Sequence, residues 1–94
     1  MHIGFRERSL ADAANRAESG TERWGSHASD VRVALACLRA IPALEQAGDL
    51  FSVDESLAVF KGRRCDVWIR FDMRGMPRVL PIVAIDAVER RSES

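Results

Sequence analysis

The sequence has no tyrosine, two histidines and two cysteines among its 94 residues. Cys37 and Cys65 stand outside any CxxC or histidine-rich segment, which is more typical of reduced core residues than of a disulfide or a metal site. We therefore predict neither a metal ion nor a cofactor. Every apolar run is shorter than the roughly 20 residues that span a bilayer, and no basic-then-apolar signal peptide opens the chain. The sequence thus predicts a cytoplasmic protein without membrane contact.

The net charge is zero, because 14 Lys and Arg residues balance 14 Asp and Glu residues. The hydrophobic share of 47% and the charged share of 30% are typical of a folded protein, and the length suits a single domain over residues 1–94. Positive charge is nevertheless concentrated, since residues 61–78 hold six Lys or Arg and two Asp. This basic segment either contacts phosphate or another anionic surface, or pairs with the acidic residues of the chain itself.

The first half of the sequence predicts one short strand and two helices. Residues 2–5 alternate in the manner of a strand. Small and apolar residues at helical spacing predict a helix over residues 9–19 that ends at Gly20. An amphipathic stripe predicts a second helix over residues 29–41. Trp24 lies in the polar linker between the helices, and we expect it to close one end of the core.

The second half predicts a hairpin. Residues 67–73 alternate between apolar and polar, which indicates a strand with Arg70 on its outward face. Residues 79–88 are almost all apolar and predict a central strand buried on both faces, with a bulge at Pro81. The segment from Ser52 to Phe60 starts like a capping box and is either a short helix or the entry into the sheet.

These elements give an α+β fold in the order β-α-α-β-β. The fold is a small, mostly antiparallel sheet of three to four strands with two helices packed on one face. We expect Leu35, Leu38 and Ile41 of the second helix to pack against the sheet. The strand residues expected to meet them are Val67, Ile69, Phe71, Val79, Ile82, Val83 and Ile85.

Four short segments follow one another in an order that resembles a known family. They are Phe5-Arg6-Glu7-Arg8-Ser9-Leu10, Leu38-x-x-Ile41-Pro42-x-Leu44, Phe60-Lys61-Gly62-x-Arg64 and Ile69-Arg70-Phe71. Their order is similar to that of the RelE/ParE/HigB superfamily of toxin-antitoxin toxins, from about Ile3 to Asp86. The resemblance implies a toxin that cleaves mRNA on the ribosome, or poisons gyrase, until an antitoxin partner silences it.

The resemblance also assigns site residues. RNA cleavage of this type is an attack of the 2′-hydroxyl on the adjacent phosphate, which needs proton transfer and neutralisation of phosphoryl charge, and the guanidinium group matches phosphate geometry. The anion-binding candidates are Lys61, Arg63, Arg64, Arg70 and Arg78. The catalytic candidates are Arg70, Arg78 and Asp86. Apart from the resemblance, the apolar side chains of Trp68 and Met76 are the candidates for contact with a protein partner, as in a protein-binding inhibitor.

Several positions depart from the family pattern. Pro77 replaces the aromatic residue before Arg78, and the segment around Asp86 has neither tyrosine nor histidine. His2 and His27 lie far from it in sequence, and we expect them to serve packing or solvent contacts.

The usual acid-base pair is therefore missing, and three hypotheses remain. The chain is an active endoribonuclease toxin, a toxin-type relative that acts by binding alone, or an unrelated non-enzymatic inhibitor, phage- or host-encoded, on a small α+β scaffold. The expected partners are an antitoxin or another protein, the ribosome or RNA, and a second copy of the chain in a homodimer.

Overall fold

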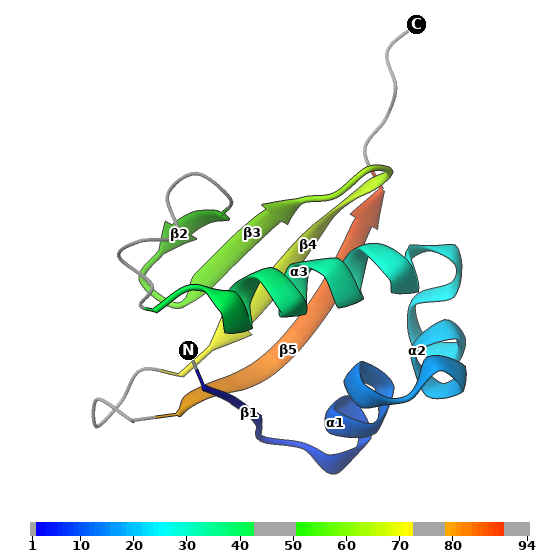
Figure 1. Cartoon of the computed structure of the whole chain (residues 1–94), viewed down its shortest axis with the longest axis horizontal. Helices are drawn as coiled ribbons and strands as arrows, with labels where there is room; N and C mark the ends of the chain where they lie inside the picture. The colour runs from blue at the N-terminus through cyan, green and yellow to red at the C-terminus, as the bar shows by residue number, and fades with distance from the viewer. Residues whose placement is uncertain (1, 43–50, 73–78, 90–94) are drawn as a thin grey trace, which may run out of the picture.

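The structure, a computed structural model, describes residues 2–42, 51–72 and 79–89. Within these ranges the chain forms five strands and three α-helices (Figure 1). In chain order the elements are β1 Ile3–Phe5, α1 Arg8–Asn15, α2 Ala17–Trp24, a 3₁₀ turn Gly25–His27, α3 Ala28–Ala40, β2 Phe51–Asp54, β3 Leu57–Lys61, β4 Cys65–Phe71 and β5 Leu80–Glu89. None of the helices in the described ranges is long and apolar enough to cross a membrane.

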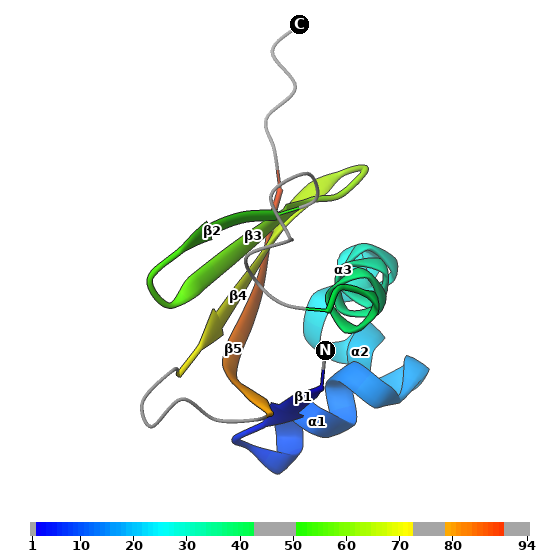
Figure 2. The ribbon, with the colours of Figure 1, turned by 60° about the vertical axis from the view of Figure 1, so that its left-hand side comes forward.

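The strands form one mixed sheet in the order β1-β5-β4-β3-β2. Strands β2 to β5 pair antiparallel with their neighbours, whereas β1 pairs parallel with β5, with Ile3 opposite Leu80. The helices cover one face of the sheet, and among the described elements no helix lies on the other (Figures 1 and 2). The α+β class is confirmed, and the sheet has five strands in place of the expected three to four.

The additional strands are β2 and β3. Ser52 belongs to β2 and Glu55 to the tight turn that follows, so the expected capping box is wrong and the sheet alternative for this segment is correct. Phe51 pairs with Phe60 across the two strands, and their ring centroids lie 5.3 Å apart. Both rings point to the helix-covered face and are buried. This cross-strand aromatic pair explains why the segment joins the sheet.

The expected helix over residues 9–19 is two helices, α1 and α2. Arg16, between them, has an extended backbone (φ −113°, ψ 131°). The expected stop at Gly20 is wrong, because Gly20 is buried inside α2. A Cβ atom at Gly20 would lie 2.8 Å from the carbonyl oxygen of Ala13. Glycine is therefore required there because it lets the two short helices pack closely.

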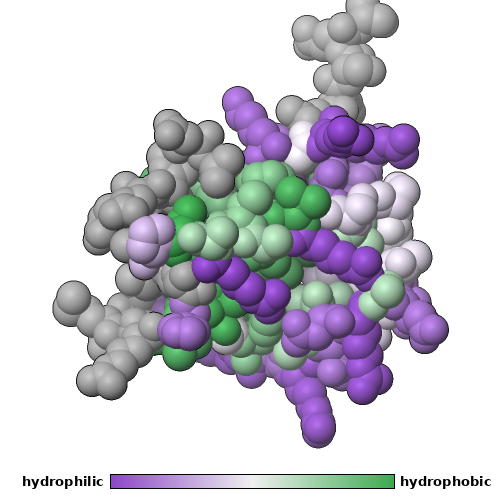
Figure 3. Space-filling view, in the orientation of Figure 1, coloured by the Kyte–Doolittle hydropathy of each residue, from purple (hydrophilic) through white to green (hydrophobic). Residues whose placement is uncertain are grey.

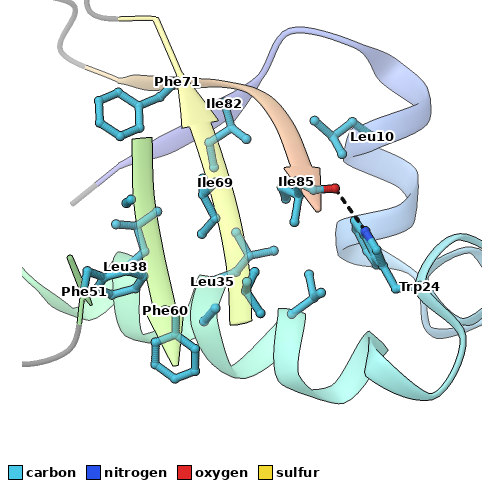
Figure 4. Packing of buried hydrophobic residues seen from close by; sticks show 14 of the residues in the cluster. Leu10, Trp24, Leu35, Leu38, Phe51, Phe60, Ile69, Phe71, Ile82 and Ile85 are labelled. Atoms are coloured by element: carbon cyan, nitrogen blue, oxygen red, sulfur yellow. Dashed lines mark hydrogen bonds between the residues drawn. The ribbon is translucent and has the colours of Figure 1, made fainter. Parts of the chain in front are cut away.

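Helix α3 agrees with the prediction for residues 29–41 to within one residue at each end. Ile41 has an extended backbone (ψ 142°), as expected for a residue that precedes proline. Val31 of α3 is buried in the core, and Leu35 and Leu38 are buried against the sheet (Figure 4). The strand residues in the same core are Ala58, Phe60, Val67, Ile69, Phe71, Leu80, Ile82 and Ile85.

The predicted register of β4 is confirmed, since Ile69 is fully buried and Arg70 is exposed. The prediction of a core position is wrong for two residues, Val79 and Val83. Val79 is 45% exposed, because it precedes β5, and Val83 is only half-buried. The register of β4 with β5 shifts at this point, where Arg70 pairs with Ala84 but Phe71 pairs with Ile82. The bulge therefore lies at Val83 and turns that side chain away from the core.

Strand β5 is central, as predicted, but it is not buried on both faces. Leu80, Ile82 and Ile85 are buried while Val88 is 44% exposed. No bulge is needed at Pro81, which pairs with Gly4 of β1. The carbonyl oxygen of Pro81 accepts a hydrogen bond from Asp72, just beyond the end of β4. The nitrogen of Pro81 points to the same side as its carbonyl oxygen, beyond the last residue of β4. The pairing of β4 with β5 therefore needs no N–H group at this position.

Candidate functional site

The face of the sheet without helices carries the candidate site. Paired residues of neighbouring strands share a face, and the pairs place Trp68 between Val59 and Asp86, and Arg70 between Leu57 and Ala84. We call this surface the outer face. Its residues at the centre and towards the β3–β4 turn are Leu57, Val59, Lys61, Asp66, Trp68, Arg70, Ala84, Asp86 and Val88.

Trp68 occupies the middle of the outer face. Its side chain is half-buried between neighbours on β3 and β5. The indole Nε1 atom is buried, and no hydrogen-bond partner for it lies in the described ranges of the chain. An N–H group without a partner is unusual in a folded protein, because burying it costs free energy. Trp68 therefore presents an apolar surface at the centre of this face, while its indole N–H lies beneath that surface.

A basic turn closes one end of the outer face. It comprises residues 61–64, and Lys61, Arg63 and Arg64 are exposed. Within the described part of the chain, their side chains and that of Arg70 form no ion pair. Within the described residues, these four side chains therefore do not pair with the acidic helices of the protein. Their charges face solvent and are available to a ligand.

The basic turn is anchored to the start of α3 by Asp30. This carboxylate is only 8% exposed, and its Oδ2 atom accepts hydrogen bonds from the backbone N–H of Arg64 at 3.1 Å and from the thiol of Cys65 at 3.4 Å. Gly62 lies against the same carboxylate, since a Cβ atom there would be 2.8 Å from Asp30 Cγ. The turn is therefore held in one position relative to the helix.

Asp30 remains ionised in this environment. Burial alone would raise the pKa of its carboxyl group, but the hydrogen bonds that it accepts lower it. The backbone N–H of Arg64 contributes most, followed by the thiol of Cys65 and the backbone N–H groups of Arg63 and Cys65. The net effect is a pKa below the ordinary value of 3.8. A buried negative charge thus sits beneath the backbone of the basic turn.

The predicted anion-binding residues do not form one compact cluster. Lys61 pairs with Asp66 at one end of β4, and Arg70 lies four residues further along that strand, about 13 Å away at ~3.3 Å per residue. Arg78 and Met76 lie outside the described residues. The cations are therefore spaced along the outer face, with Trp68 between them.

The outer face also carries acidic residues. Asp86 is exposed and pairs with Trp68, so it stands diagonally from Arg70, at about 7–8 Å between backbones. Asp66 shares the row of Lys61. Neither His2, beside β1, nor His27, at the start of α3, belongs to the described part of this face. The face therefore combines cations, carboxylates and an indole, without a neutral base beside Arg70.

A second surface lies on the solvent side of α3. Val33 is 52% exposed, and Ala36 and Ala40 are exposed at the spacing of one helix face. Figure 3 shows this apolar stripe over α3 with hydrophilic side chains beside it. Next to the stripe, α3 and the α1–α2 junction enclose an open hollow of about 430 Å³, whose lining includes Arg32 and Arg39.

Asp30 is the site residue that the sequence failed to identify. Its position in the first turn of the predicted helix indicates only a helix cap, whereas in the structure it holds a turn 34 residues away. No local pattern carries that information.

Comparisons of the chain with family models, with curated proteins and with solved structures find no match.

Proposed function

We propose that this chain is a toxin-type protein of a toxin-antitoxin module that acts by binding a host target, with RNA of the ribosome as the first candidate. The observation that carries the proposal is the outer face. A half-buried Trp68 lies between exposed Arg70 and the basic turn, and none of these cations is neutralised by an ion pair in the described residues.

This arrangement suits a single-stranded nucleic acid. Proteins that bind single strands combine a positively charged track for the backbone with aromatic side chains on which bases stack. Along the direction of β4, Trp68 lies between Arg70 and the row that holds Lys61 of β3 beside Asp66 of β4, so a nucleic acid strand in this direction would meet Arg70, the indole and then Lys61. The spacing of these groups favours a chain of several nucleotides over a single phosphate.

Binding without cleavage is the better-supported form of the proposal. Cleavage through a 2′-hydroxyl needs a group that takes a proton and a group that returns one. Asp86 is the acidic residue nearest to Arg70 among the paired residues of β5, and it is exposed and diagonal to it. The residues paired directly with Arg70 are Leu57 and Ala84, whose side chains cannot transfer protons.

Induced expression in a bacterial host tests the proposal. We expect the wild-type chain to arrest growth and to sediment with ribosomes, and Arg70→Ala and Trp68→Ala to lose both effects while remaining folded. Arg32→Ala, an exposed arginine on the opposite side of the molecule, is the matched control and should keep both. Growth arrest that persists in Arg70→Ala and Trp68→Ala would contradict the proposal.

The same variants separate binding from cleavage. Intact mRNA in arrested cells, together with loss of ribosome association in Arg70→Ala, supports action by binding. Fragments of mRNA that disappear in Asp86→Asn but not in the matched variant Asp54→Asn would instead support an endoribonuclease. Asp54 is exposed at the end of β2 and is two strands away from Arg70 in the sheet.

We place the antitoxin on the apolar stripe of α3. Val33, Ala36 and Ala40 form this stripe, and Arg32 and Arg39 lie on one side of it. An amphipathic segment that buries the stripe and presents carboxylates to the arginines would match both its shape and its charge. Co-expression with an acidic open reading frame directly beside this one should give a complex by light scattering, and Val33→Asp should dissociate it.

A protein target is the second candidate, and the acidic residues of the outer face favour it. Asp66 and Asp86 reduce the attraction of this face for phosphate, whereas an apolar centre with a mixed-charge rim is typical of protein interfaces. With a protein target, the chain would be the non-enzymatic inhibitor of the third hypothesis. The two targets differ in their response to salt, because contacts with phosphates weaken steeply as salt rises and an apolar protein contact does not.

A further inference from the structure

We propose that His27, Asp30 and Cys65 form a binding site for a thiophilic divalent metal ion, with zinc as the best fit. One ligand atom from each of these residues lies within 4.8 Å of the others. The site lies on the helix-covered side of the sheet, where the start of α3 meets the first residue of β4. It is separate from the outer face and does not depend on the proposed function.

The distances suit tetrahedral zinc. Zinc binds nitrogen and oxygen at about 2.0–2.2 Å and sulfur at about 2.3 Å, which places neighbouring ligand atoms about 3.3–3.6 Å apart. Asp30 Oδ2 and Cys65 Sγ are already 3.4 Å apart. The ligand atoms of the three residues lie within 4.8 Å of one another, so the imidazole of His27 must approach by up to about 1.5 Å to complete the third ligand position. A half-buried side chain at the end of a 3₁₀ turn can make that adjustment by rotation.

The imidazole supplies an independent observation. Among the residues that the structure describes, none is a hydrogen-bond partner of the Nδ1 atom of His27, which is buried. A buried polar atom normally has a partner, and a bound metal ion would supply one. Neutral imidazole nitrogen is a preferred ligand of zinc, and this nitrogen belongs to the side chain that stands beside Asp30 and Cys65.

The other two ligands are prepared for a cation. Asp30 is a buried carboxylate whose Oδ2 atom lies 3.4 Å from the sulfur of Cys65, so an oxygen ligand already stands beside the sulfur ligand. Cys65 is fully buried and its thiol points at that carboxylate. Metal binding replaces this S–H···O hydrogen bond by a metal–thiolate bond, and the thiol proton leaves to solvent. Three protein ligands leave the fourth position of the metal to water or to a group from outside.

A metal ion at this site would affect the basic turn. His27 ends the 3₁₀ turn that leads into α3, Asp30 lies in the first turn of α3, and Cys65 follows directly after the basic turn. A metal ion at this point would join the helix to the hairpin more firmly than the existing hydrogen bonds, and would fix the direction in which Arg63 and Arg64 project. The metal would therefore be structural and would order the turn that we assign to target binding.

Cobalt(II) is the probe for the test, because cobalt bound to thiolate gives a near-ultraviolet charge-transfer band. The chain is first treated with a chelator and a phosphine reductant and then titrated with cobalt alone. We expect a band that saturates at a single equivalent and that zinc abolishes by displacement. Cys65→Ala should eliminate the band. His27→Gln should lower the affinity at least tenfold, since even loss of residues that only support metal ligands costs about 10–100-fold.

The chain contains a matched control for each substitution. His2 and Cys37 are the second histidine and the second cysteine of the sequence, and neither belongs to the cluster. His2→Gln and Cys37→Ser should bind cobalt as the wild type does. Circular dichroism confirms the fold of each variant, and if Cys65→Ala does not fold, His27→Gln decides. Absence of a band in the folded wild type, a band that Cys37→Ser removes, or an affinity unchanged in His27→Gln would overturn the proposal.

Discussion

The indole N–H of Trp24 donates a hydrogen bond to the carbonyl oxygen of Ile85 at 3.2 Å (Figure 4). Strand β1 pairs with β5 only as far as Ile82, so beyond that residue the edge of β5 has no neighbouring strand in the described sheet. Trp24 is 9% exposed and belongs to the core. It thus closes one end of the core, as the sequence predicts, and also covers a strand edge that would otherwise attract other chains.

Trp24→Phe should reduce the free energy of unfolding by about 1–2 kcal/mol, because it removes this hydrogen bond and leaves a buried carbonyl oxygen without its partner. Trp68→Phe is the matched control, since the Nε1 atom of Trp68 makes no hydrogen bond with the described residues, and we expect it to be neutral or slightly stabilising. Urea unfolding followed by circular dichroism measures both. An equal loss in the two variants would show that ring size, and not the hydrogen bond, accounts for the effect.

Gly62→Ala should destabilise the chain by about 1–3 kcal/mol through crowding. The new Cβ atom would lie 2.8 Å from both the Cγ atom of Asp30 and the carbonyl oxygen of Cys65, neither of which is the end of a flexible side chain. Arg63→Ala alters an exposed residue of the same turn and should remain within about 0.5 kcal/mol of the wild type. Thermal unfolding of the three proteins at one pH compares them, and a Gly62→Ala variant as stable as Arg63→Ala would contradict the packing described.

The stabilisation that Asp30 provides should depend on pH. Its pKa in the folded protein lies below the ordinary value of 3.8, so its ionisation favours folding. That contribution is complete above the ordinary pKa and is lost as the pH falls through the lower folded-state pKa. Asp30→Asn cannot titrate and should be less stable than the wild type at neutral pH.

The difference between the wild type and Asp30→Asn should therefore shrink as the pH falls below about 3.8. Urea unfolding at a series of pH values measures it. The other carboxylates titrate in both proteins, so the comparison isolates Asp30. A difference that stays constant across this range would mean that Asp30 is not ionised in the folded protein.

If RNA binds to the outer face through its phosphates, its affinity should fall as the salt concentration rises. For single strands the logarithm of the affinity falls with the logarithm of salt concentration by about 0.7 for each phosphate neutralised. With a single-stranded oligoribonucleotide as the probe, Arg70→Ala should reduce this slope by about one such increment, and Arg32→Ala should leave it unchanged. Trp68→Ala should lower the affinity at every salt concentration without changing the slope, because stacking carries no charge.

The elements that the sequence predicts well are those with a local pattern. Helix α3 and strand β4 each repeat apolar residues at a regular spacing, which is sufficient to place Leu38 in the core and Arg70 on the surface. Strand β2 has four residues and no comparable repeat. The bulge at Val83 depends on the register between two strands, and the anchoring of the basic turn by Asp30 depends on two segments far apart in sequence. Such contacts form only when the chain folds, so no local sequence pattern predicts them.

The parallel pairing of β1 with β5 also constrains the time at which the protein can assemble. Strand β5 lies between β1 and β4 in the sheet, yet the ribosome synthesises it after both. While β5 is still being made, β1 has no partner and the inner faces of α1 and α2 have no strand edge to cover. Pairing Ile3 with Leu80 closes a loop of nearly the whole described chain, and contacts of such long range slow folding. A nascent chain that has reached β4 therefore carries the basic turn without a finished sheet behind it, and β5 completes the sheet in one late step.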